Sequence, residues 1–269
     1  MEWWQALILG LVEGITEYLP VSSTGHLLVV ERMLGFGGSE AAHAYAIVIQ
    51  AGAIMAVLGL YRQRVAGMVS GLVGNNSAGA HLARMVVLAF LPAATLGFFA
   101  DDVVEDALFG PWPIVVAWAA GGLFLLILAP KLHKRPGQSL ENLAWTGALW
   151  IGVIQCCALW PGVSRSLATI LGGIAVGLSL PAAVEFSFLL GLVTLGAASV
   201  YKAVSSGAAM VTVYDIDVMV IGFGTAWISA AVAVRWMVRW LNERGFALFG
   251  WWRLVAASVV GGLLLFGKL

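Results

Sequence analysis

Charge is scarce in this sequence. Asp, Glu, Lys and Arg make up 10% of its 269 residues, whereas a soluble domain has about 25%. Hydrophobic residues make up 61%, and the mean hydropathy is +0.95. These values predict an all-α integral membrane protein surrounded by lipid. The formal net charge is zero and there is no basic tail or stripe, so we expect no nucleic acid among its partners.

Two other features are missing. The only two cysteines, Cys156 and Cys157, are adjacent in an apolar run, so neither a disulfide framework nor a cysteine metal site is expected. The first residues, Met-Glu-Trp-Trp, contain no basic region and no small-residue cleavage site, so we expect no cleaved signal peptide. The informative residues are therefore the few polar ones inside the apolar stretches.

Six stretches are apolar enough to cross a bilayer, which takes about 20 residues. They lie at 43–61, 85–100, 112–130, 182–202, 218–236 and 250–268. Two further apolar segments, 1–41 and 143–178, are interrupted by polar and helix-breaking residues. We therefore expect six transmembrane helices and two irregular segments.

The loop charges predict an orientation, because Lys and Arg near the ends of spans mark the cytoplasmic side. The segment 101–106 is purely acidic and is expected to be an outer loop. With the basic loops inside, both termini fall outside, and the segments 1–41 and 143–178 must each return to the side from which they start. Both are therefore predicted to be re-entrant, with backbone that is buried in protein or lines a wet cavity. The basic residues used for this orientation are Arg62, Arg64, Arg84, Lys131, Lys134, Arg135, Arg235, Arg239, Arg244 and Arg253.

The two halves of the chain resemble each other. The sequence GLVE at 10–13 is echoed by GVIQ at 152–155, and PVSST at 20–24 by PGVSRS at 161–166. Each half, roughly 1–130 and 143–269, would hold one re-entrant segment and three spans. Three crossings place the second copy upside down, which predicts an inverted-topology repeat within a single membrane domain.

The densest polar cluster lies at residues 13–26. Glu13 and Glu17 are four residues apart and share one helix face. Two like charges are tolerated there only if a cation or a shared proton lies between them. Pro20 and Gly25 are expected to break the helix. Around these breaks come groups that bind anions or transfer protons: Ser22, Ser23, Thr24 and His26.

The second irregular segment contains Arg165, the only Lys or Arg between Arg135 and Lys202. An arginine at membrane depth marks a functional site by default, and its planar fork matches phosphate oxygens. If the tips of the two re-entrant segments meet, their groups suit phosphoester chemistry. The carboxylates would hold a divalent cation, and His26 or a serine would transfer protons or attack. The same segment also carries three hydroxyls: Ser164, Ser166 and Thr169.

Each of these residues also has a structural interpretation. Glu13 and Glu17 can form a buried polar pair with the opposite segment, and Arg165 can be only their counter-ion. The hydroxyls of the first segment, from Ser22 to Thr24, can cap the next helix, and His26 can be an interior histidine with satisfied ring nitrogens. Two glutamines in apolar spans are expected to bond across helices near the site: Gln50 and Gln155.

Residues 11–27, LVEGITEYLPVSSTGHL, closely resemble the signature of the BacA-type undecaprenyl-diphosphate phosphatases, and PGVSRS at 161–166 resembles their second motif. Further similarity at 49–52, 90–93 and 183–190 extends the resemblance over almost the whole chain. It implies a bacterial cytoplasmic-membrane enzyme that removes the terminal phosphate from undecaprenyl diphosphate, recycles this cell-wall carrier lipid and confers bacitracin resistance. It also implies a Ca²⁺ or Mg²⁺ requirement and a site open toward the outer side.

The resemblance also implies roles for individual residues. Glu13 and Glu17 would form the acidic pair associated with the cation. Ser23 would be one candidate nucleophile, His26 would be the acid/base or an alternative nucleophile, and Arg165 would grip the phosphates. From the residues alone, a water activated by Glu17 also remains open as the attacking group. Diphosphate binding would fall to Ser22, Thr24, Ser164, Ser166 and Thr169.

Three positions depart from the family pattern. Leu167 stands where a glycine is usual, Leu180 where an arginine is usual, and Val193 where a proline is usual. Leu167 is expected to narrow the second tip or to change its backbone conformation. The loss of charge at Leu180 removes a candidate anchor or phosphate contact.

These departures leave two alternatives to a phosphatase. One is a transporter or flippase of a polyprenyl phosphate or another anionic lipid, because inverted repeats with broken helices are also typical of transporters. The other is a silent lipid-binding protein. A homodimer is compatible with the sequence, which shows no interface pattern.

Overall fold

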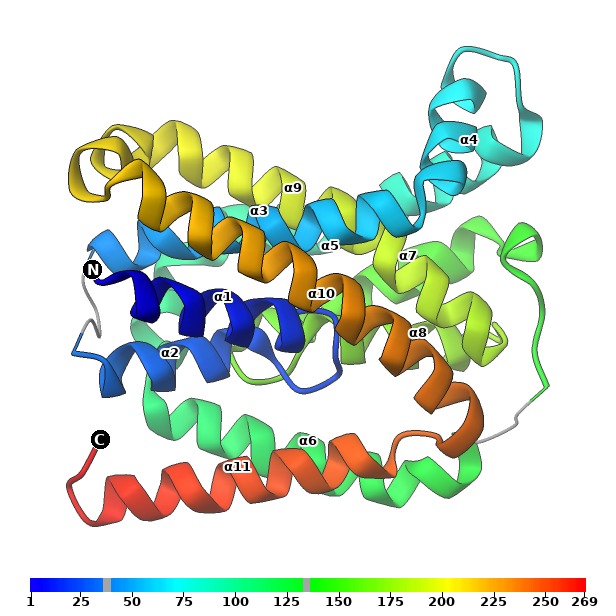
Figure 1. Ribbon diagram of the computed structural model, residues 1–269. Helices are drawn as coiled ribbons and strands as arrows, with labels where there is room; N and C mark the ends of the chain where they lie inside the picture. The colour runs from blue at the N-terminus through cyan, green and yellow to red at the C-terminus, as the bar shows by residue number, and fades with distance from the viewer. Residues whose placement is uncertain (36–39, 133–135) are drawn as a thin grey trace.

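The computed structural model describes residues 1–35, 40–132 and 136–269, and the regular structure in these ranges is helical. Each apolar stretch contains one or more helices (Figure 1). Their bounds are α1 Trp3–Thr16, α2 Ser23–Met33, α3 Glu40–Leu60, α4 Arg62–Leu72, α5 Ser77–Leu108, α6 Pro111–Leu132, α7 Trp145–Gln155, α8 Arg165–Ala175, α9 Leu180–Val213, α10 Ile216–Arg244 and α11 Ala247–Leu265, with short 3₁₀ turns at Leu140–Asn142 and Cys156–Leu159. The expected all-α fold is confirmed.

Within the described residues, five helices are long and apolar enough to cross a membrane: α5, α6, α9, α10 and α11. A sixth span results if α3 and α4, which are bent by 83° from each other at Tyr61, are taken together. The six stretches expected from hydropathy coincide with α3, α5, α6, α9, α10 and α11.

Two of the expected loops are the acidic segment 101–106 and the basic loop that contains Lys134 and Arg135. The acidic segment 101–106, expected to be a loop, continues α5 to Leu108. Helical backbone does not require apolar side chains, and no glycine or proline interrupts the chain between Gly97 and Gly110. Of the basic residues used for orientation, Lys134 and Arg135 lie outside the described residues.

The two interrupted segments form helical hairpins. The first is α1 and α2 with a turn at 17–22, and the second is α7 and α8 with a turn that ends at Ser164. The hairpins enter the bundle from opposite sides, and their turns approach each other near its middle, while both chain termini lie on one side (Figure 1). The turns are in contact, because the hydroxyls of Ser164 and Ser166 donate to the carbonyl oxygen of Leu19 at 3.4 and 2.9 Å.

The two hairpins share details of backbone and packing. Helices α2 and α8 are each 11 residues long. Each is preceded by a serine with positive φ, Ser22 at 74° and Ser164 at 78°, and no other described non-glycine residue has positive φ. α1 packs on α10 where a Cβ on Gly10 would lie 2.6 Å from a carbonyl, and α7 packs on α5 at the matching Gly152. The sequence similarity between the halves is thus accompanied by similar local structure.

Gly25 has a different role from the expected one. It lies inside α2 and does not break that helix. A Cβ at Gly25 would lie 2.6 Å from the Trp118 ring of α6, so the missing side chain allows α2 to approach α6 closely.

Arg253 is also placed differently. Loop charge predicts a cytoplasmic basic loop for this residue, but it lies within α11 and is 0% exposed. Its two terminal nitrogens donate to four carbonyl oxygens at 2.8 to 3.3 Å: those of Pro20, Ala117, Gly162 and Val163. The carbonyls freed by the broken turns make this buried charge tolerable. Arg253 therefore connects both turns to α6 and α11.

We predict that Arg253→Met destabilises the protein. The substitution leaves carbonyls of both turns without a donor, and each such buried group costs about 1–3 kcal/mol. The expected loss is about 3 kcal/mol or more, seen as a lower melting temperature in detergent. Arg239→Met, at an exposed arginine of α10, is the control. Equal melting temperatures for the two variants would contradict the role given to Arg253.

Candidate active site

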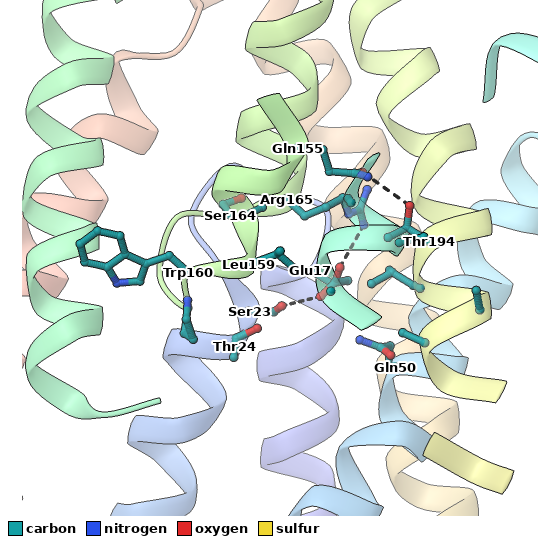
Figure 2. A pocket seen from close by; sticks show the side chains of 18 of the residues that line it. Glu17, Ser23, Thr24, Gln50, Gln155, Leu159, Trp160, Ser164, Arg165 and Thr194 are labelled. Carbon is teal, nitrogen blue, oxygen red and sulfur yellow. Dashed lines mark hydrogen bonds and ion pairs between the residues drawn. The ribbon is translucent and has the colours of Figure 1, made fainter. Parts of the chain in front are cut away.

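A cavity of about 450 Å³ lies where the two turns meet. Its polar end is formed by the starts of α2 and α8, and its remaining walls come mainly from α5 and α9 (Figure 2). Six of the residues predicted to form a site line it: Glu17, Ser22, Ser23, Thr24, Ser164 and Arg165. The structure therefore brings residues of both motifs to one place.

Glu17 is the centre of this end of the cavity. One carboxylate oxygen accepts a hydrogen bond from the Ser23 hydroxyl, and the other accepts one from Arg165 Nη2 at 3.0 Å (Figure 2). The Glu17 and Arg165 side chains are 6% and 10% exposed, so their ion pair is largely shielded from solvent. A hydroxyl, a carboxylate and a guanidinium thus form a connected chain at the wall of the cavity.

Arg165 is held from three further sides. Its Nη1 donates to the carbonyl oxygen of Ser187 at 3.1 Å, and its guanidinium lies 5.3 Å from the ring centre of Tyr18. A side chain at Gly191 of α9 would collide with the guanidinium. The orientation of Arg165 is therefore set by α9 and the first turn as well as by its own helix.

Both helices that follow the turns begin at the cavity. The N-terminus of a helix carries free N–H groups and a partial positive charge, which favour anions. Ser22 and Thr24 flank the start of α2, and the Ser164 hydroxyl caps α8 by accepting from the N–H of Leu167 at 3.3 Å. The sequence predicts capping by Ser22, Ser23 or Thr24, but the Ser22 side chain at the N-cap of α2 makes no capping hydrogen bond, so the hydroxyl that caps a helix here is that of Ser164.

Four predicted site residues are not among the described residues that line the cavity: Glu13, His26, Ser166 and Thr169. Ser166 bonds to the other turn through Leu19. Thr169 lies 2.6 Å from the hydroxyl of Ser187, whose carbonyl also binds Arg165. These two hydroxyls therefore bond the second hairpin to the first turn and to α9, outside the cavity lining.

His26 uses both of its ring nitrogens. Nδ1 lies 2.7 Å from the carbonyl oxygen of Ser22, and Nε2 lies 3.0 Å from the indole N–H of Trp252. A carbonyl can only accept and an indole N–H can only donate, so these contacts require a neutral ring protonated on Nδ1. His26 therefore fixes the backbone immediately before Ser23.

Glu13 lies one helical turn behind Glu17 and is 1% exposed. Its Oε1 is buried and has no hydrogen-bond partner in the described part of the chain. An unpaired carboxylate oxygen beside a second carboxylate suits a divalent cation, and Mg²⁺ often uses one or two carboxylates with phosphate oxygens and water. No group of three or more His, Cys, Asp or Glu residues that could hold a metal occurs among the described residues. Glu13 and Glu17 are the two carboxylates here that could contribute to a cation site, and of the two only Glu17 is among the described residues that line the cavity.

The cavity also has polar residues that the sequence analysis did not assign to the site. Thr194 of α9 lines it, as do Lys202 and Trp160. Thr194 is one of three Ser or Thr residues in the apolar span 182–202, and Lys202 lies at the end of that span, so neither stands out in the sequence. The expected cross-helix bonds of the two glutamines are present: Gln50 accepts from Ser199 at 2.9 Å, and Gln155 accepts from Thr194 at 3.5 Å.

The three departures from the family pattern lie away from the cavity lining. Leu167 has helical backbone inside α8 and is 4% exposed in the apolar core, so it does not line the second tip. Leu180 is buried at the start of α9, and Val193 packs against the core from the same helix. The residues that line the polar end of the cavity are unchanged by these departures.

Comparison with known proteins is consistent with this geometry. The family model described as bacitracin resistance protein BacA matches residues 6–259. Undecaprenyl-diphosphatase 1 of Chromobacterium violaceum is 41% identical over 96% of this chain and 94% of its own length. A second relative with the same name, from Pseudomonas fluorescens, is 41% identical over 98% and 94%. Undecaprenyl-diphosphatase 2 of Rhodospirillum rubrum is 42% identical over 95% and 93%.

We predict strong energetic coupling between Glu17 and Arg165. Removing one partner of a buried ion pair leaves an uncompensated charge, which costs about 3–5 kcal/mol. Glu17→Gln and Arg165→Met should each lower the melting temperature in detergent. The double variant should be more stable than the sum of the two losses implies, by about 1 kcal/mol or more. Additive losses in this double-mutant cycle would refute the coupling.

Proposed function

The chain belongs to the BacA family of bacitracin resistance proteins, and we propose that it hydrolyses undecaprenyl diphosphate to undecaprenyl phosphate and inorganic phosphate. The observation that carries this proposal is the hydrogen-bonded chain of Ser23, Glu17 and Arg165 where two helix N-termini meet in a cavity with apolar walls. It combines groups for anion binding and proton transfer at membrane depth.

The diphosphate binds at the polar end of the cavity. Arg165 and the N-terminal N–H groups of α2 and α8 provide positive charge and donors for phosphate oxygens. Because these groups are fixed before substrate arrives, they also stabilise the charge that develops when the phosphoanhydride bond breaks.

Ser23 is the proposed nucleophile and Glu17 its general base. The Ser23 hydroxyl already donates to the Glu17 carboxylate. In the proposed step the serine oxygen forms a bond to the terminal phosphorus, the bond from that phosphorus to the bridging oxygen breaks, and the serine proton moves to Glu17. Undecaprenyl phosphate leaves, and water then attacks the phosphoserine to release inorganic phosphate.

Glu13 and Glu17 are the residues that would hold a Ca²⁺ or Mg²⁺ ion, which would supply further positive charge against the phosphate oxygens. The unpaired Glu13 oxygen supports this assignment. His26 contributes indirectly in this proposal, because its bond to the Ser22 carbonyl keeps the following Ser23 in place.

The apolar part of the cavity is the proposed path of the prenyl chain. It runs along α5 from Phe90 to Phe98 and along α9 from Thr194 to Lys202. Small residues keep this path open, and a Cβ on Gly97 would have only Leu159 nearby, at 3.5 Å. A long hydrocarbon chain can therefore leave the polar end between two spans.

The proposed topology is an inverted repeat of the parts 1–130 and 143–269, with two re-entrant hairpins. It is supported by the equal lengths of α2 and α8, the positive φ of Ser22 and Ser164, and the matched packing of α1 and α7. The orientation proposed for a bacterial cytoplasmic membrane has both termini outside. The cavity extends from the turns toward that side, where both termini lie (Figure 1).

We predict phosphate release from undecaprenyl diphosphate by the purified protein in detergent with Ca²⁺ or Mg²⁺, and loss of release with a chelator. Ser23→Ala and Arg165→Ala should each reduce kcat by about 100-fold or more, since each removes a group that acts on the transition state. Ser258→Ala, at an exposed serine of α11, is the matched control.

Protein that binds the lipid yet releases no phosphate under any metal condition would refute the phosphatase and favour transport. Release that is unchanged by Ser23→Ala would refute the serine nucleophile and favour direct attack by water.

We also predict that Gly97→Leu obstructs the prenyl chain. The KM for undecaprenyl diphosphate should rise about tenfold, equivalent to 1.4 kcal/mol, while the Ki of inorganic pyrophosphate, which has no chain, should stay within about twofold. Gly196→Leu is the control, because a Cβ there meets no other atom within 4 Å. Equal changes in KM and Ki would place the prenyl chain elsewhere.

A further inference from the structure

Gln155, at the end of α7, has a buried donor without a partner. The residue lines the cavity, yet it is 2% exposed. Its Nε2 has no hydrogen-bond partner in the described parts of the chain. Its oxygen accepts from the Thr194 hydroxyl at 3.5 Å, but that hydroxyl has one proton and lies closer, at 2.9 Å, to the carbonyl of Leu190. The amide is therefore only weakly held by protein.

An unpaired buried N–H group is unfavourable unless an acceptor reaches it. The same cavity wall contains a second such donor, Nε of Arg165. Figure 2 shows the Arg165–Glu17 pair lying between Gln155 on one side and Ser23 on the other. Unpaired donors thus lie on the Gln155 side of the pair, and the proposed nucleophile lies on the other, so the two phosphates of a diphosphate would lie on either side of Arg165.

The position of Gln155 in the sequence supports an anion rather than a cation as its ligand. It follows Gly152 in GVIQ as Glu13 follows Gly10 in GLVE. At this position the first half has a carboxylate, which accepts hydrogen bonds and attracts cations. The second half has an amide, whose NH₂ group donates hydrogen bonds without adding charge. An amide beside Arg165 suits phosphate oxygens.

We propose that Gln155 is a diphosphate-binding residue whose amide donates to an oxygen of the phosphate that remains on the lipid. This assignment rests on the proposed function, in which Ser23 attacks the terminal phosphate on the other side of Arg165. Gln155 contributes to ground-state binding and transition-state binding equally, because its ligand is not the transferred group.

The test compares Gln155→Leu and Gln155→Glu with wild type in the full-length protein. The KM for undecaprenyl diphosphate and the Ki of inorganic pyrophosphate should both rise about tenfold in Gln155→Leu, with kcat within about twofold. Gln155→Glu should bind more weakly still, because a carboxylate repels phosphate. Cys156→Ser is the matched control, since its thiol bonds to the carbonyl of Gly152 and it does not line the cavity among the described residues.

Other results would overturn the proposal. A fall in kcat with unchanged KM and Ki would show that Gln155 only ties α7 to α9. If Gln155→Leu melts early, Gln155→Met, which keeps the length of the side chain, takes its place.

Calorimetric binding of pyrophosphate separates this proposal from the proposed function. Wild-type protein that binds pyrophosphate without hydrolysing lipid diphosphate would refute the phosphatase while leaving the Gln155 comparison valid. Equal pyrophosphate affinity of wild type and Gln155→Leu would overturn the role of Gln155. Absence of pyrophosphate binding to wild type would overturn the diphosphate site at Gln155, whereas the phosphatase is decided by phosphate release from the lipid.

Discussion

The fold depends on hydrogen-bond donors for the backbone carbonyl oxygens of two turns that lie in apolar surroundings. Two turns interrupt the helices near the middle of the bundle, and their carbonyl oxygens have no helical partner. The guanidinium of Arg253 donates to Pro20 in the first turn and to Gly162 and Val163 in the second. Hydroxyls of the second turn add bonds to Leu19 of the first. One buried arginine thus holds together the two segments that carry the polar groups of the cavity, and its positive charge needs no carboxylate because several carbonyl dipoles surround it.

The second arginine, Arg165, has a carboxylate as its main partner, whereas Arg253 has carbonyl oxygens. Arg165 is paired with Glu17, and Glu17 also binds the Ser23 hydroxyl, so a change at any of the three alters the other two. Electrostatic interactions are strong in this poorly solvated place, which makes the pair costly to break and effective against phosphate charge. Each buried arginine lies against a glycine of a neighbouring helix, Gly191 for Arg165 and Gly121 for Arg253. Absent side chains on these helices are therefore as much a part of the site as the charged groups.

In the proposed repeat, the two halves divide the chemistry of the site. In the proposed mechanism, the first half contributes two carboxylates and a nucleophile, Glu13, Glu17 and Ser23. The second contributes donors, with Arg165 and the amide of Gln155. A symmetric site would offer equal groups to both phosphates of the substrate, although only one of them is transferred. Divergence of matching positions in a repeated framework supplies one side suited to a cation and proton transfer and another suited to an anion.

The sequence by itself determined the membrane class, the six apolar stretches and the two motifs with their isolated Arg165, because hydropathy and short spacings are local properties. It also predicted that the motifs meet, since the halves resemble each other. Other features were decided only by the tertiary structure. Arg253 was read as a loop residue because its partners lie between 90 and 233 residues away. Gly25 was read as a helix breaker because Trp118, which it accommodates, lies on another helix. The bond from Trp252 to His26, and the state of the Gln155 amide nitrogen, which has no partner among the described residues, likewise depend on how distant segments pack. Depth and hydrogen-bond satisfaction are properties of the packed chain, because a polar side chain acquires its partners only when remote segments come together.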